Sequence, residues 1–120
     1  MNQTERRRFL IDALLDERPE YRGARVPADG EEQQFLLRAL MNVRTARKCS
    51  PEFLRVQDEY LRAELEAKGI TDIGSLMPVR RGLYIWRGDI TTLRCDAIVN
   101  AANSGMTFIR KIQIEDMVFF

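Results

Sequence analysis

Histidine is absent from the 120 residues of this chain, and cysteine occurs only twice. Without histidine, these residues cannot form a Ser-His or Cys-His nucleophile pair or a histidine-ligated metal site. Cys49 and Cys95 are far apart and do not form a Cys-x-x-Cys motif. Two cysteines alone cannot complete a tetrahedral zinc site. We therefore expect both thiols to be reduced and structural.

The chain also lacks a long apolar run and an excess of charge of either sign. No stretch approaches the roughly 18 apolar residues that cross a bilayer, and the polar N-terminus has no signal-peptide core. The 19 basic and 18 acidic residues give a net charge of +1. This balance gives no electrostatic reason to expect nucleic acid or a membrane as a partner. Composition therefore predicts a cytoplasmic protein that binds neither.

Apolar residues at helical spacing predict two helices before residue 49. The first covers residues 4–17, with Thr4 as its N-cap. Its basic run at residues 6–8 is interpreted as a solvated helix face, because the chain as a whole is charge-balanced. The second helix covers residues 31–48, and Asp29 is expected to cap it.

A third helix is predicted for residues 51–68. Ser50 can cap it, and Pro51 suits the first helical position, where its missing N–H is not needed. Gly69 provides a typical C-terminal end. The apolar stripe of this helix, which is expected to face the core, consists of Phe53, Val56, Tyr60, Ala63 and Ala67.

The pattern then changes to short β-favouring runs at residues 83–86 and 97–99. The intervening residues 90–96 are too few for a helical crossover between parallel strands. The two runs therefore form either a hairpin or two non-adjacent strands. Together with the helices, they predict an α/β fold in which three helices precede the beginning of a sheet.

The first of these runs leads into Gly88 and Asp89, at the carboxyl end of a predicted strand. An ionised aspartate only accepts hydrogen bonds, so Asp89 suits a ligand edge that presents donors, such as an amine. The alternative is a local cap, in which the carboxylate accepts from the N–H groups of Thr91 and Thr92. The residues by themselves favour the cap. At Trp86 and Cys95, the sequence favours a role in packing over a role in binding or catalysis.

The second run leads into a small polar loop. Asn100 and Asn103 carry both donors and acceptors, which suit sugar hydroxyls. Between them, Ala101 and Ala102 are small enough to let a ligand approach the backbone. The alternative is a strand-terminating turn, which is the better interpretation of this motif alone.

Taken together, the two motifs point to one protein family more specifically than either motif does alone. Gly-Asp-Ile-Thr at residues 88–91, followed by Asp-Ala-Ile-Val-Asn-Ala-Ala-Asn-Ser at residues 96–104, resembles the start of a macrodomain. The macrodomain is an ADP-ribose-binding module with a three-layer α/β/α fold and a mixed sheet. The helix at residues 50–54 and the approach at residues 76–78 resemble the N-terminal extension of the microbial zinc-dependent branch. Members of that branch are ADP-ribosyl hydrolases.

The resemblance implies a domain organisation and a partner. Residues 1–82 would be the helical extension and linker, residues 83–107 the start of the macrodomain, and residues 108–120 a tail outside the family pattern. The partner would be ADP-ribose or an ADP-ribosylated protein. The implied activity is hydrolysis of the glycosidic bond between ADP-ribose and a modified protein side chain.

The resemblance also implies roles for individual residues. Asp89 would accept from the adenine 6-amino group, and the backbone N–H of Ile90 would donate to a ring nitrogen. Asn103 would be catalytic, touching the distal ribose near the cleaved bond. The cleft that binds the ligand would also be lined by Asn100, Ala101 and Ala102.

The sequence departs from the family after Thr107. The zinc-dependent branch continues there into a loop with cysteine and histidine ligands, whereas residues 108–120 contain neither. We therefore expect the family's zinc to lack its ligands in this chain, and the chain to be a truncated, inactive form. The alternatives are a non-catalytic module that binds ADP-ribose or a nucleotide, and a helical fragment that acts through protein contacts.

Overall fold

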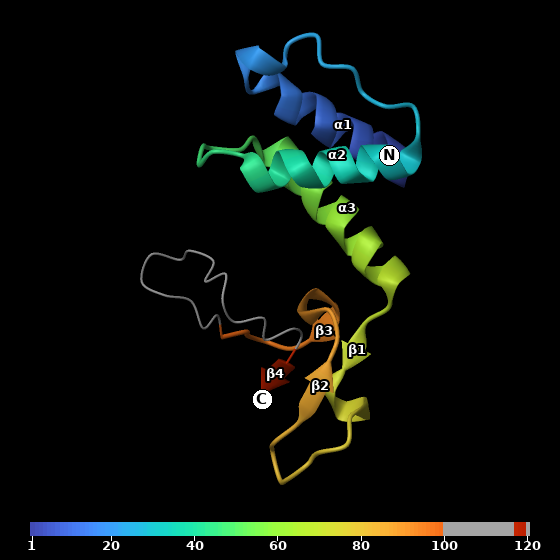
Figure 1. Cartoon of the computed structure of the whole chain (residues 1–120), viewed down its shortest axis with the longest axis vertical. Coiled ribbons are helices and arrows are strands. Elements are labelled where there is room, and N and C mark those ends of the chain that lie inside the picture. Colours follow the sequence, from blue (N-terminus) through green and yellow to red (C-terminus); the bar gives the residue numbers. More distant parts are fainter. Residues whose placement is uncertain (100–116, 120) are drawn as a thin grey trace. The chain divides into compact units, whose positions relative to one another are not determined.

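The structure is a computed structural model that describes residues 1–99 and the backbone of residues 117–119 (Figure 1). Its contacts divide the chain into a helical unit, residues 1–64, and a strand unit, residues 65–120. Three helices followed by strands confirm the α/β expectation at this level. None of the described helices combines the length and apolarity that crossing a bilayer requires.

Helix α1 covers Gln3–Asp16, and its N-cap is Asn2. The Asn2 side chain accepts from the Glu5 N–H at 2.9 Å, and the Glu5 carboxylate accepts from the Asn2 N–H at 2.7 Å. This reciprocal pair needs an acceptor three residues before the glutamate, a spacing that Asn2 has. The prediction that Thr4 is the cap is therefore wrong. A short 3-10 helix, η1 (Pro19–Tyr21), follows α1.

Helix α2 covers Gly30–Val43. Asp29 caps it as predicted, because its side chain accepts from the N–H groups of Glu31 and Glu32, each at 3.0 Å. The predicted end at residue 48 is wrong. The backbone becomes extended at Arg44, whose guanidinium pairs with Glu17 beyond the end of α1.

Helix α3 covers Pro51–Lys68 and confirms the predicted range. The Ser50 hydroxyl accepts from the Phe53 N–H at 3.1 Å. Gly69 has a φ of 89°, the left-handed conformation that ends helices readily. The predicted apolar stripe is buried in its first half only, because Ala63 is half-buried and Ala67 is exposed.

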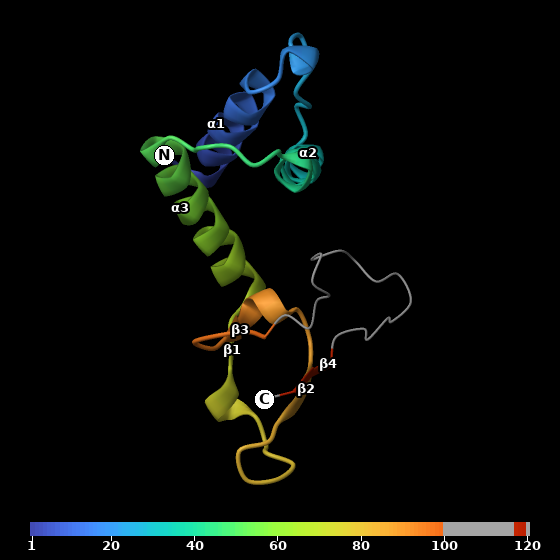
Figure 2. The same cartoon turned by 90° about the vertical axis from the view of Figure 1, so that its left-hand side faces the viewer.

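The core of the helical unit lies between its helices. Helix α2 packs beside α1, and Figure 2 shows α2 almost end-on. Its buried members come from all three helices: Leu10, Ile11, Leu14, Leu37, Leu40, Phe53, Val56 and Tyr60. Cys49 packs against this cluster as a half-buried free thiol, as expected.

Arg7 corrects the interpretation of residues 6–8 as a solvated face. Arg7 is only 8% exposed, and its Nε donates to the Gln33 side-chain oxygen at 3.0 Å. Gln33 in turn donates to the Pro27 carbonyl oxygen at 2.7 Å. Burying a charge is costly unless it is hydrogen-bonded. The Gln33 side-chain oxygen is the partner of Arg7, and the bond from Gln33 to Pro27 holds that side chain in place. Periodicity alone did not indicate a buried arginine.

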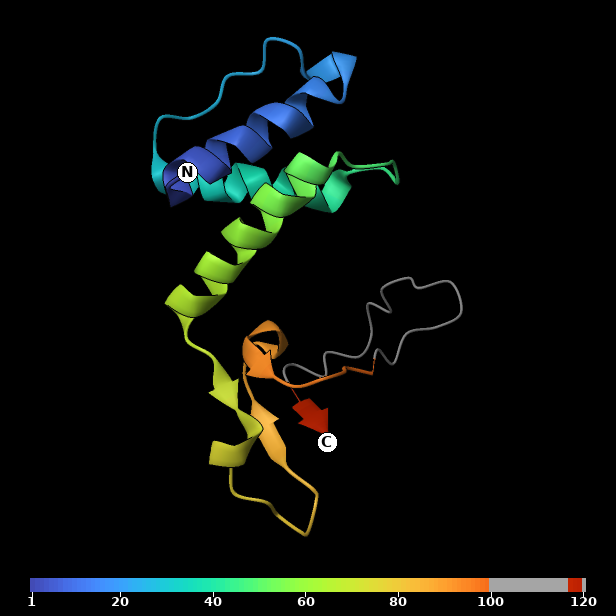
Figure 3. The same cartoon turned by 180° about the vertical axis from the view of Figure 1, so that it is seen from behind.

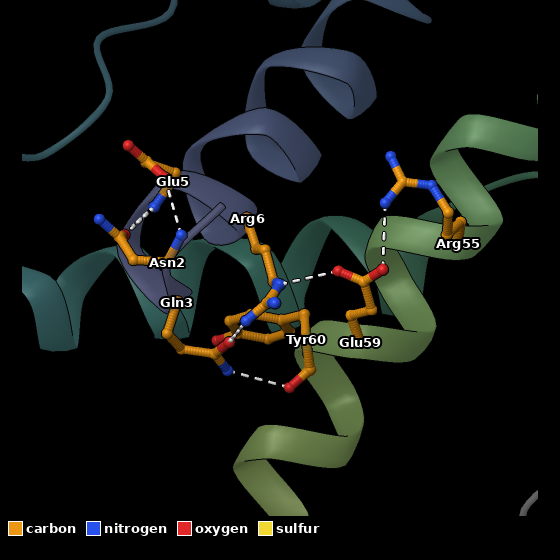
Figure 4. Close-up of polar contacts among 7 residues, drawn as sticks. All are labelled: Asn2, Gln3, Glu5, Arg6, Arg55, Glu59 and Tyr60. Carbon is orange, nitrogen blue, oxygen red and sulfur yellow. Dashed lines mark hydrogen bonds and ion pairs between the residues drawn. The ribbon is translucent and has the colours of Figure 1, made fainter.

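A polar network joins the beginning of α1 to α3 (Figure 4). Arg6 Nε contacts one Glu59 carboxylate oxygen at 3.1 Å, and Arg55 contacts the other at 3.0 Å. The Gln3 side-chain amide donates to the Tyr60 carbonyl oxygen at 2.9 Å. The hydrogen bonds from Arg55 and Arg6 lower the pKa of Glu59 below its ordinary range.

The described residues of the strand unit form two short strand pairs. β1 (Thr71–Asp72) runs parallel to β3 (Leu93–Arg94), with Thr71 opposite Leu93. β2 (Ile85–Arg87) runs antiparallel to β4 (Met117–Phe119), drawn in red in Figure 3. A second 3-10 helix, η2 (Ile73–Ser75), follows β1 directly.

These pairs test the predicted strands. β2 confirms a strand near residues 83–86, shifted toward its C-terminal end. The strand predicted at residues 97–99 is wrong, because those residues form no strand and Val99 is 93% exposed. Leu93 is buried instead, and its strand pairs with β1. Because residues 97–99 form no strand, neither the hairpin nor the two non-adjacent strands predicted for these runs is found. The strands that form, β2 and β3, pair with different partners.

The cap of α1 gives a direct test of the corrected boundary. We expect Asn2→Ala to lower the free energy of unfolding by about 1 kcal/mol, the usual effect of losing a helix cap. Thr4→Ala changes an exposed residue and should stay within about 0.5 kcal/mol of the parent. Urea unfolding followed by circular dichroism measures both. The reverse ranking would contradict Asn2 as the cap.

The Glu17–Arg44 pair predicts a pH dependence of stability. The hydrogen bond from Arg44, assisted by nearby positive charges, lowers the pKa of Glu17 below its ordinary 4.5. A lowered folded-state pKa means that ionised Glu17 stabilises the fold above pH 4.5, and that this contribution is lost as the pH falls through the folded-state pKa.

Thermal unfolding of Glu17→Gln between pH 7 and pH 3 checks this expectation. Its deficit against the parent protein should be largest at neutral pH and should shrink toward pH 3. Glu66→Gln, at an exposed position on α3, is the matched control. A deficit that does not change with pH would argue against the ion pair.

Candidate functional site

The candidate site is the turn that follows β2. Its 3-10 helix, η3 (Ile90–Thr92), is capped by Asp89. Asp89 Oδ1 accepts from the Thr91 N–H at 2.9 Å and from the Thr91 hydroxyl at 2.6 Å. The Thr92 N–H donates to the Asp89 carbonyl oxygen, not to the carboxylate. The predicted cap is therefore confirmed for Thr91 and wrong for Thr92.

The second carboxylate oxygen of Asp89 faces a lysine. Lys68, the last residue of α3, places its Nζ 3.6 Å from Asp89 Oδ2. The Thr91 hydroxyl and N–H lower the pKa of Asp89 below its ordinary range, and Lys68 adds to the effect. Asp89 is therefore ionised at neutral pH and acts as an acceptor only.

A donor lies directly beside this acceptor. Ile90 is the first residue of η3, and the N–H at that position has no acceptor within its own helix. Asp89 side-chain exposure is 49%, so solvent and ligands can reach the carboxylate. The arrangement complements a ligand edge that carries one donor next to one acceptor.

Trp86 packs against the backbone of this turn. A Cβ added at Gly88 would lie 2.3 Å from Trp86 Cζ2, so only glycine leaves room for the half-buried ring. The expectation that Trp86 has a packing role is consistent with this contact. Trp86 is also the single tryptophan of the chain, so its fluorescence reports on the site.

The other predicted site residues follow Val99 in the sequence. Asn100, Ala101, Ala102 and Asn103 lie outside the described residues. The structure therefore brings Asp89 and Ile90 together and leaves the predicted ribose contacts as predictions.

Sequence reasoning missed two partners of Asp89. The place of Thr91, two residues after an aspartate, predicts a bond from its N–H but gives little sign of one from its hydroxyl. Lys68 was predicted only as the last residue of the third helix. It lies far from Asp89 in the sequence, so no local pattern indicated their contact.

The described residues do not fit a zinc ion. Across residues 1–99, no three histidine, cysteine, aspartate or glutamate side chains gather as metal ligands would. Cys49 belongs to the helical unit and Cys95 to the strand unit, and both are free thiols. We therefore derive no chemical step through zinc.

Comparison with known proteins places the chain beside two bacterial enzymes. It is 58% identical over 111 residues to a protein-ADP-ribose hydrolase of Treponema medium, a match that covers 89% of the chain and 42% of the relative. It is 42% identical over 97 residues to a protein-ADP-ribose hydrolase of Staphylococcus aureus strain MRSA252, covering 80% of the chain and 36% of the relative. The chain thus spans about two fifths of these relatives' length. No protein-family model matches it.

The contact between Gly88 and Trp86 predicts the effect of a single methyl group. We expect Gly88→Ala to displace the indole, change the fluorescence emission of Trp86 and cost about 1–3 kcal/mol, as overpacking usually does. Gly74→Ala is the control, because its new Cβ would lie 3.3 Å from Asp72 Oδ1 and not beside the indole. Unchanged emission in Gly88→Ala would show that the ring does not cover this backbone.

Proposed function

We propose that this chain carries the adenine-binding end of an ADP-ribose site, in a protein that hydrolyses the bond between ADP-ribose and a modified protein side chain. The observation that carries the proposal is the 58% identity over 111 residues to a protein named as such a hydrolase. The matched length covers 89% of the chain. We further propose that the whole protein has the three-layer macrodomain fold and belongs to the zinc-dependent branch of that family.

The geometry of the turn supports a specific way of binding adenine. The ionised Asp89 carboxylate would accept from the 6-amino group, and the Ile90 N–H would donate to the neighbouring ring nitrogen. A 6-oxo purine presents an acceptor where adenine presents a donor. Two acceptors facing each other leave a desolvated group unpaired, so the site would reject such a base.

The remaining predicted contacts belong to the same proposal. Asn103 would touch the distal ribose near the cleaved bond, and the cleft would continue along Asn100, Ala101 and Ala102. Zinc is kept only as a property of the proposed family, because the described residues do not fit it.

Calorimetry with ADP-ribose tests the binding part of the proposal. We expect measurable heat at millimolar ligand, and a loss of about tenfold or more in affinity for Asp89→Ala, since a charge-assisted hydrogen bond is removed. Asp72→Ala is the matched control, because Asp72 caps η2 through the N–H of Gly74 just as Asp89 caps η3. No heat from the parent chain would overturn the proposal for this chain.

A hydrolysis assay on an ADP-ribosylated protein separates binding from catalysis. We expect this chain to bind ADP-ribose without releasing it from the modified protein. Release that disappears in Asn103→Ala would contradict the expected inactivity and would assign catalysis to these residues. Oligomers seen by size-exclusion chromatography, without any ligand heat, would favour the helical interaction fragment.

A further inference from the structure

The strand unit contains the same aspartate turn twice. Asp72 is the last residue of β1, and Asp89 is the second residue after β2; each caps a 3-10 helix. Asp72 Oδ1 accepts from the Gly74 N–H at 2.9 Å, and Asp89 Oδ1 accepts from the Thr91 N–H at the same distance. In each turn a hydroxyl three residues on donates to the aspartate carbonyl oxygen at 2.7 Å.

One side-chain hydrogen bond distinguishes the two turns. Thr91 adds a hydroxyl that donates to Asp89 Oδ1 at 2.6 Å, whereas the equivalent residue of the other turn is Gly74, which has no side chain. The turn at Asp72 forms without such a bond. The Thr91 hydroxyl is therefore not required to make the turn.

We infer that Thr91 is a positioning residue that directs the Asp89 carboxylate toward a ligand amine, an inference that rests on the proposed function. The N–H and hydroxyl of Thr91 together occupy Oδ1, since a carboxylate oxygen has two lone-pair directions. The free acceptor capacity then lies on Oδ2. Thr91 thus selects which oxygen meets the 6-amino group of adenine.

The surroundings of Asp89 agree with this role. Lys68 approaches Oδ2 at 3.6 Å, longer than a strong hydrogen bond, so Oδ2 keeps room for a second donor. The hydrogen bonds of Thr91 also lower the pKa of Asp89 and keep it a pure acceptor. Thr91 is exposed, so replacing it removes the hydroxyl without opening the core.

A ligand-free measurement tests the contact itself. We expect carbon-13 NMR titration to show the pKa of Asp89 moving toward its ordinary range in Thr91→Val and staying low in Thr91→Ser. Ser75→Ala, which removes the hydroxyl of the other turn, should leave Asp89 unchanged. A pKa of Asp89 that does not respond to Thr91→Val overturns the inference, whatever the chain binds.

Binding measurements then test whether Thr91 affects the affinity and the base preference of the site. We expect Thr91→Val to weaken ADP-ribose by about two- to tenfold, the range of one net hydrogen bond, and to reduce the preference over inosine diphosphate ribose. Thr91→Ser should restore both values. An unchanged preference in Thr91→Val overturns the assignment of specificity. If the parent chain binds neither ligand while the pKa of Asp89 responds to Thr91→Val, the proposed function fails and the specificity role fails with it.

Discussion

Segments from all three helices of the helical unit meet at one guanidinium. Arg44 makes a two-pronged contact with Glu17, with Nε 2.9 Å and Nη2 2.7 Å from the two carboxylate oxygens. The same guanidinium lies 5.5 Å from the centroid of the Phe53 ring, within the range of a cation–π contact. Arg44 thereby joins the segment after α1, the end of α2 and the first turn of α3. The fork shape of arginine suits such a junction, whereas a lysine would offer a single point of charge.

This junction also accounts for the end of α2. Residues 44–48 carry no proline or glycine that would break a helix. The backbone leaves the helix at Arg44, where its side chain pairs with Glu17. Arg47 reinforces the turn by donating to the Glu17 carbonyl oxygen at 2.9 Å. A partly desolvated ion pair together with packing on Phe53 thus outweighs local helix propensity.

In the strand unit, a single aspartate serves both local structure and the proposed ligand. The sequence posed cap and ligand acceptor as alternatives for Asp89, but a carboxylate has two oxygens. One oxygen caps η3, and the other faces outward beside Lys68. The two interpretations are therefore compatible. The zinc expected of the proposed family has no comparable support among the described residues.

Strong local signals made parts of the structure predictable. Ser50 and Pro51 predicted the start of α3, Gly69 predicted its end, and Asp29 predicted the start of α2, because each acts through its own neighbouring backbone. The predicted cap at Thr4 failed because of a neighbour, Asn2, but other predictions failed because the deciding partner was distant in sequence. The apolar residues 97–99 suggested a strand, but a strand also needs a partner, and the pairing with β1 falls at Leu93.

By itself, the sequence determined the three helices and the acidic turn at Asp89, and it carries motifs that resemble those of an ADP-ribose-binding family. These features depend on residues that are close together in the chain. The tertiary structure decided that Arg7 is buried, that Arg44 ends α2, and that Lys68 and the Thr91 hydroxyl share Asp89. The contacts of Arg7, Arg44 and Lys68 join distant parts of the chain, and no local pattern of charge or hydropathy specifies which partners will meet.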